Sequence, residues 1–152
     1  MKYTLLAAVA AAMMIGSGPA LAEILIEHPA YAYQTAPQQK NGVIFLGLRN
    51  TGESAVSVTA VTTDIADKLE LHSVSTDGGM MQMREVDSFL IPAGGDLTLE
   101  PMGNHIMVMG LHEPLQLDAT FPLTIKLDNG DALQTEVTIV KPGFTHASNP
   151  DH

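Results

Sequence analysis

The sequence of 152 residues predicts an all-β protein, an antiparallel β-sandwich or barrel of Greek-key type built as a single domain. Three observations predict it. Short segments alternate apolar and polar side chains with the two-residue period of a strand. Turn signals such as Pro92–Gly95 and Asp128–Gly130 separate these segments. No window of helical length carries a 3.6-residue apolar period, and Asp64–Asp67 allows one helical turn at most.

The first 22 residues have the features of a secretory signal peptide. Lys2 gives a basic start, Thr4–Ile15 form an almost uninterrupted apolar core, and Ala20–Ala22 provide a small-x-small cleavage pattern. We expect cleavage near Ala22 and Glu23, and a soluble exported protein. The apolar core is shorter than the roughly 20 residues that cross a bilayer, so we expect no membrane anchor.

The strand candidates follow one another along residues 23–140, which we expect to form one β-sandwich domain. Their ranges are 23–27, 43–49, 55–62, 68–72, 80–86, 89–91, 96–100, 105–110, 123–127 and 133–140. Residues 28–42 have Pro, Gln and Gly spacing without a helical period and are predicted as a loop. Residues 141–152 are polar and punctuated by Gly and Pro, and are predicted as a flexible tail.

Charge and missing residue types exclude several functions. Seven Lys and Arg face 17 Asp and Glu, a formal net charge of −10, and cleavage would remove Lys2 as well. Such a surface repels nucleic acid and anionic lipid, so neither is expected as a partner. The chain has no cysteine, which excludes thiol catalysis and a blue-copper centre. It also lacks a Ser/His/Asp arrangement, HExxH and a phosphate loop, and we expect no enzyme.

Soft metal ligands are concentrated in one stretch of the chain. After residue 22, every methionine lies between Met80 and Met109, and His72 and His105 bracket most of them. Thioether sulfur is a soft donor and imidazole a borderline one, so a site containing both without a thiolate favours Cu(I). The sequence therefore predicts a Cu(I) site in this stretch.

Strand alternation indicates where these donors point. Aliphatic residues at positions 69, 71, 106 and 108 suit the core, which turns His72, His105 and Met107 to the opposite face. For Met80, Met102 and Met109 taken singly, core packing or a hydrophobic lip is the favoured interpretation. Packing is the weaker explanation for the set His72, Met83, His105 and Met107, because aliphatic residues already occupy the core face.

The spacing of this set resembles a known family. Ten residues separate His72 from Met83, twenty-one separate Met83 from His105, and one separates His105 from Met107. This spacing resembles the H-x10-M-x21-H-x-M pattern of the periplasmic PCu(A)C-type copper chaperones. The flanking segments are also similar to that family's: they are Glu70–His72, Gly79–Arg84, Ile91–Gly95 and His105–Leu111. The resemblance covers essentially all of the expected domain, including Asn50–Gly52.

The resemblance implies a cupredoxin-like β-sandwich that binds one Cu(I) per chain through His72, Met83, His105 and Met107. It also implies delivery of copper for assembly of the dinuclear copper centre of cytochrome c oxidase. The acceptor would be cytochrome c oxidase subunit II or another periplasmic copper chaperone, and we expect a monomer. Two alternatives stay open: a periplasmic copper buffering or tolerance protein, and a metal-free β-sandwich binding module with a Met-lined docking surface.

Four further histidines could supply a second, weaker Cu(II) site, because Cu(II) prefers nitrogen and oxygen donors. They are His28, His112, His146 and His152.

Acid should release Cu(I) through the histidines, because thioethers do not protonate in this range. We predict that affinity weakens as the pH falls through about 6.5, where imidazole takes up a proton. A titration of Cu(I) affinity that stayed flat from neutral pH to about pH 5 would remove histidine from the coordination sphere.

Overall fold

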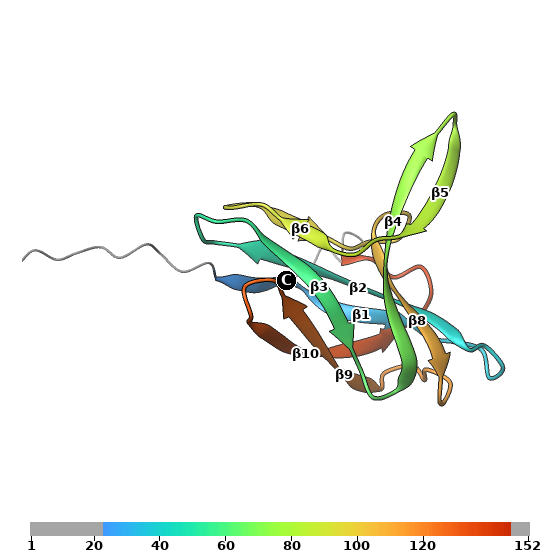
Figure 1. Cartoon of the computed structure of the whole chain (residues 1–152). Coiled ribbons are helices and arrows are strands. Elements are labelled where there is room, and N and C mark those ends of the chain that lie inside the picture. Colours follow the sequence, from blue (N-terminus) through green and yellow to red (C-terminus); the bar gives the residue numbers. More distant parts are fainter. Residues whose placement is uncertain (1–22, 147–152) are drawn as a thin grey trace, which may run out of the picture.

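Ten strands follow one another in the computed structural model, which describes residues 23–146 (Figure 1). They are β1 (Ile24–Tyr33), β2 (Asn41–Asn50), β3 (Val56–Thr62), β4 (Ala66–Asp77), β5 (Met80–Glu85), β6 (Phe89–Ile91), β7 (Asp96–Thr98), β8 (His105–Leu111), β9 (Thr120–Leu127) and β10 (Ala132–Val140). The all-β prediction is confirmed. No helix in this part of the chain is long and apolar enough to cross a membrane. The predicted signal peptide lies outside the described residues.

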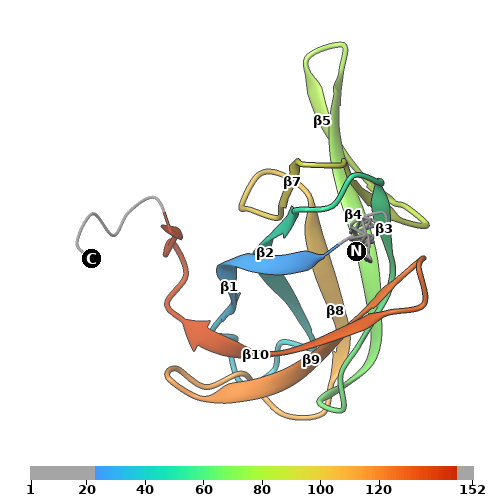
Figure 2. The same ribbon diagram turned by 90° about the vertical axis from the view of Figure 1, so that its left-hand side faces the viewer.

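The ten strands form one sheet, in which hydrogen-bonded neighbours follow the order β5-β4-β8-β2-β1-β10-β9-β3-β6. The remaining strand, β7, pairs with β2. All pairs are antiparallel except one: β1 and β10 run parallel, with Tyr31 opposite Thr138 and Tyr33 opposite Val140. The predicted antiparallel arrangement therefore needs a correction at the first and last strands. The sheet folds over on itself, so that β3, β9 and β10 lie across from β2 and β8 (Figures 1 and 2).

Alternating apolar residues from both halves of this sheet fill a single core. In β9 every second residue is buried, from Phe121 to Leu127. In β8 Ile106 and Val108 are buried, as the alternation predicted, and Leu111 at the end of the strand is buried as well. Ile106 and Val108 lie opposite Leu71 and Leu69 of β4 respectively. The side chains on either side of them in sequence must therefore point away from the core.

The predicted loop 28–42 is wrong at both ends, because β1 continues to Tyr33 and β2 begins at Asn41. Proline normally interrupts a strand, and Pro29 is one of the residues on which the loop prediction rests. Here the pairing of β1 with β2 shifts register between Ile26 and His28 and again between His28 and Tyr31. These irregularities accommodate Pro29. Pairing with both β2 and β10 makes β1 an interior strand, which no local pattern in the sequence reveals.

The hairpin of β4 and β5 projects beyond the rest of the sheet (Figures 1 and 2). The strand predicted at 68–72 is the part of β4 that pairs with β8, and that pairing ends at His72 opposite His105. From His72 to Asp77 the strand pairs with β5 instead. His72 therefore lies where β4 passes from the body of the sheet into the hairpin, with a partner on each side.

Asn50 fastens the end of β2 to two neighbouring segments. Its side chain is completely buried. Its Nδ2 donates to the carbonyl oxygens of Ser54 at 2.8 Å and Ile91 at 3.1 Å, and its Oδ1 accepts from the backbone N–H of Gly52 at 2.9 Å. All three hydrogen bonds of the Asn50 side chain are made to backbone groups. Shortening this side chain would therefore leave those backbone groups without their partner.

We predict that Asn50→Ala lowers the free energy of unfolding by about 2–4 kcal/mol, because three backbone groups lose their partner. Denaturant unfolding of the purified domain measures it. The matched control is Asn129→Ala, which removes an exposed turn contact to the N–H of Asp131 and should cost less than about 1 kcal/mol. Equal losses in the two variants would contradict this role for Asn50.

Candidate metal centre

The four sequence-predicted donors lie on three adjacent strands, in the order β5-β4-β8. His72 is directly opposite His105, and Met107 follows two positions after His105 on the same face of β8. Met83 is opposite Val74, which lies two residues after His72. Residues opposite each other in an antiparallel pair point to the same side of the sheet. All four donors therefore share one face, as the alternation predicted for His72, His105 and Met107.

The two imidazoles are already close together. Their ring centroids are 5.5 Å apart, and the ring planes are inclined by 54°. A metal ion that bonds one nitrogen of each ring at about 2.0–2.1 Å would hold the ring centres roughly 5–6 Å apart. Only small side-chain adjustments are therefore needed to bring both histidines onto one ion.

Hydrogen bonds leave one nitrogen of each ring free to bind. His72 Nε2 donates to the Glu70 carboxylate at 2.8 Å, which leaves Nδ1 as the nitrogen of that ring with a free lone pair. Within residues 23–146, His72 Nδ1 is the one buried side-chain nitrogen or oxygen without a hydrogen-bond partner. His105 Nδ1 donates to the carbonyl oxygen of Gly103 at 2.9 Å, leaving Nε2 available. Metal-binding histidines typically make this outer hydrogen bond, which fixes the tautomer and ring orientation.

Burial differs among the donors. His105 is only 7% exposed and packs edge-on against Phe45, at 6.5 Å between ring centroids. Met83 on the projecting hairpin is 64% exposed. A pocket of about 350 Å³ connects them, since Met83, His105 and Met107 all line it above Phe45. His72 joins this group through its ring contact with His105. The site has imidazoles on its inner side and a thioether on its outer side.

The sequence pattern gives Glu70 no role, although Glu70 lies two residues before His72 on β4 and on the same face. Lys68 and His72 both donate hydrogen bonds to this carboxylate. These bonds, with Lys68 contributing most, hold the pKa of Glu70 below its usual range. Glu70 therefore stays ionised at neutral pH. Its negative charge beside His72 favours a cation in the site, and the hydrogen bond makes the free nitrogen of His72 a better electron-pair donor.

Three of the four histidines proposed for a second, Cu(II) site are described, and only two of them, His28 and His146, lie together. His112 bonds Asp67 at 2.9 Å, at the opposite end of β8 from His105. His28 and His146 stack with ring centroids 5.5 Å apart. No group of three or more His, Cys, Asp or Glu side chains in the described part is placed to hold a metal ion. His152 lies outside it.

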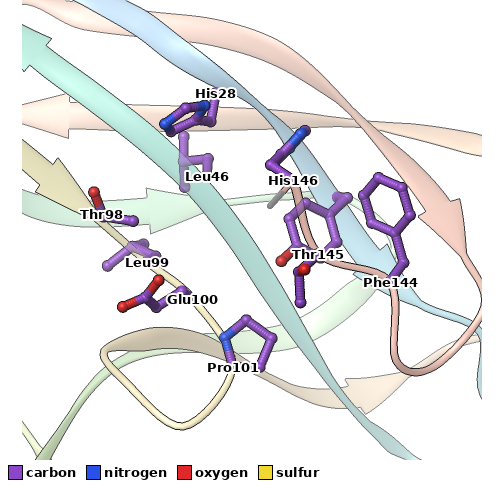
Figure 3. Close-up of a pocket in the computed structure, with 10 residues that line it drawn as sticks. His28, Leu46, Thr98, Leu99, Glu100, Pro101, Phe144, Thr145 and His146 are labelled. Carbon is purple, nitrogen blue, oxygen red and sulfur yellow. The ribbon is translucent and has the colours of Figure 1, made fainter. Parts of the chain in front are cut away.

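The His28–His146 contact belongs to a larger cavity of about 530 Å³ (Figure 3). Phe144 and His146, from the predicted tail, form one wall of it, and Glu100 approaches from the other side. Tyr33 donates to the carbonyl oxygen of Phe144 at 3.0 Å, so residues 141–146 of the expected tail lie against the sheet. Burial, with Tyr33 and Glu100 nearby, raises the pKa of Tyr31 to about 12. This cavity has no thioether in its lining, and the soft donors gather elsewhere.

The comparison with protein families decides the relationship. The model of the family described as "Putative lipoprotein LpqE-like" matches residues 24–139. The chain belongs to the LpqE-like family. One relative of the chain, "Putative lipoprotein Lxx21020" of Leifsonia xyli subsp. xyli, is 36% identical over 96 residues. That match spans 62% of this chain and 58% of the relative, less than two thirds of its length.

Solved structures with the same fold as this LpqE-like chain include a PCuAC domain. The copper-bound PCuAC domain from PmoF2 has a TM-score of 0.67 at 13% identity, covering 78% of this chain and 93% of that one. The solution structure of CuI-DR1885 from Deinococcus radiodurans has a TM-score of 0.66 at 28% identity, covering 88% and 87% respectively. The cupredoxin-like, all-β fold class expected from the sequence is confirmed.

We predict that Glu70→Ala lowers Cu(I) affinity roughly 10- to 100-fold, because His72 loses the acceptor that fixes its tautomer. Nitrogen NMR of the metal-free protein should show His72 changing from the Nε2–H form to a mixture of tautomers.

Glu85→Ala is the matched control, since Glu85 is opposite His72 on β5 and no hydrogen bond joins their side chains among those described. It removes the same charge and should leave the His72 tautomer unchanged. A loss of affinity as large as that of Glu70→Ala would assign the effect to charge alone.

Proposed function

We propose that this protein is a copper-binding domain of the cell envelope that carries one Cu(I) ion and delivers it to a copper-accepting protein. The ligands in this proposal are His72, Met83, His105 and Met107. The finer part of the proposal concerns the acceptor: the dinuclear copper centre of cytochrome c oxidase, reached through its subunit II or through another periplasmic copper chaperone.

The observation that carries the proposal is the free nitrogen of His72. A buried imidazole nitrogen without a partner is costly in a folded protein. That cost is offset if the nitrogen binds a metal, and its neighbours supply what a Cu(I) site needs: a second imidazole in ring contact, two thioethers and no thiolate. The similarity to the copper-bound PCuAC domain from PmoF2 and to CuI-DR1885 also supports copper binding.

Release of copper follows from the uneven burial of the ligands. All four ligands are neutral, so the ion is held without a thiolate charge that would slow its departure. The exposed thioether of Met83 is the ligand that an incoming donor from a partner can replace first, whereas His105 is shielded by Phe45. Transfer would then proceed by successive ligand exchange to an acceptor with thiolate ligands, which binds Cu(I) more tightly.

Envelope location rests on the predicted signal peptide and on the lipoprotein descriptions of the family and its relative. The 152 residues contain no cysteine, so none of them offers a thiol for lipid attachment.

X-ray absorption of the Cu(I)-loaded protein tests the ligand set. We expect about two nitrogen and two sulfur neighbours, one nitrogen fewer in His72→Ala, and one sulfur fewer in Met107→Leu. Matched controls are His112→Ala and Met109→Leu, which change the same residue types outside the set. Unchanged coordination in both ligand variants would remove these residues from the site.

Competition with a purified thiolate-containing acceptor domain tests delivery. Mixing the Cu(I)-loaded protein with the metal-free acceptor should move copper to the acceptor. Retention of the ion at equilibrium would exclude delivery and would favour the buffering function.

A further inference from the structure

Two methionines outside the four-ligand set line the same pocket as that set. Met81 comes from β5, and Met102 comes from the turn between β7 and β8. They join Met83, Met107 and His105 in the pocket lining. Four thioethers from three separate elements therefore converge on one opening of about 350 Å³, although one metal ion held as proposed above needs only two of them.

Packing does not explain these additional methionines. Met81 is 52% exposed and Met102 is 77% exposed, so the core-packing interpretation favoured for Met102 is wrong. Met81 and Met83 are two residues apart on β5 and point to the same side, toward the pocket. Met80, which is 68% exposed, alternates to the other side and does not line the pocket. Of the three β5 methionines, the two that share one side, Met81 and Met83, are therefore the ones that line the pocket, next to Val74 of β4.

The backbone at Met102 gives an independent indication. Its φ angle is +69°, in the left-handed region that glycine and asparagine adopt most readily and that a long apolar side chain rarely occupies. Neither backbone preference nor burial favours methionine at this position. Strained residues of this kind cluster at binding sites, where the side chain has a task.

We infer that Met81, Met83 and Met102 form an entry site for a soft monovalent cation, Cu(I) or Ag(I), at the mouth of the pocket. This inference rests on the proposed function, because the ion is then passed inward. Met83 belongs to both sites: the cation exchanges the thioethers of Met81 and Met102 for Met107 and the two imidazoles while Met83 stays bound. All the ligands are neutral, so the ion keeps its single charge and no electron or proton has to move.

The chemistry of the three residues suits capture. Thioethers remain free of protons at every physiological pH, and methionine has three rotatable bonds that let its sulfur adapt to an incoming ion. The histidines lie deeper and are held in place by hydrogen bonds. The outer methionines would therefore load the ion quickly, and the inner histidines would retain it.

Silver titration followed by methionine methyl NMR tests the entry site, because Ag(I) is a soft ion that stays in one oxidation state. In His72→Ala/His105→Ala, silver should still shift the methyl signals of Met81, Met83 and Met102 and leave that of Met80 in place. Adding Met81→Leu/Met102→Leu to this variant should abolish binding, whereas adding Met80→Leu should not. Unshifted Met81 and Met102 signals, or an equal shift of Met80, would overturn the inference.

A second arm leaves the histidines intact and so avoids any loss of stability at buried His105. Leucine has a volume close to that of methionine. Met81→Leu/Met102→Leu in the intact chain should still bind one Cu(I) with unchanged equilibrium affinity, but should load more slowly than Met80→Leu when Cu(I) is supplied as its bicinchoninate complex. Equal loading rates would overturn the entry site and leave the proposed function standing. Failure of every variant and of the unchanged chain to bind copper would overturn the proposed function itself.

Discussion

The pairing of β4 with β8 is the constraint on which the site depends. In this register Leu71 faces Ile106 and Leu69 faces Val108, so that one side of the pair is held in the core by aliphatic contacts. The same register puts His72 opposite His105 on the other side. A slip of one residue would move the aliphatic side chains into solvent, so the hydrophobic core also enforces the meeting of the imidazoles. The β4–β8 pair therefore contributes one face to the core and the other face to the candidate metal site.

The donors differ in how firmly the fold holds them. His72 and His105 are fixed by hydrogen bonds to Glu70 and to the backbone of Gly103. Met83 extends from a hairpin whose six β5 residues are all exposed. The proposed delivery requires an ion to be held and then released, and the contrast between the fixed histidines and the exposed thioether serves both requirements.

Most of the site could be predicted from local alternation, because the two-residue period of a strand fixes which side chains share a face. The same rule could not identify Glu70 as the hydrogen-bond partner of His72, since that contact depends on side-chain conformation as well as on the shared face. It also could not predict that β1 extends through Pro29, because the irregular pairing with β2 depends on a strand far along the chain. The exposure of Met102 was missed because a turn has no alternation from which to infer burial.

The parallel pairing of β1 with β10 has a consequence for how the chain reaches this structure. During synthesis β1 emerges first and β10 last of the ten strands, yet they lie side by side in the middle of the ladder. Until the final strand arrives, the central strand lacks one of its two neighbours, and most pairings here join distant parts of the sequence. The sheet can therefore be completed only once the last strand is available, and a chain that ended before β10 would leave one edge of β1 unpaired.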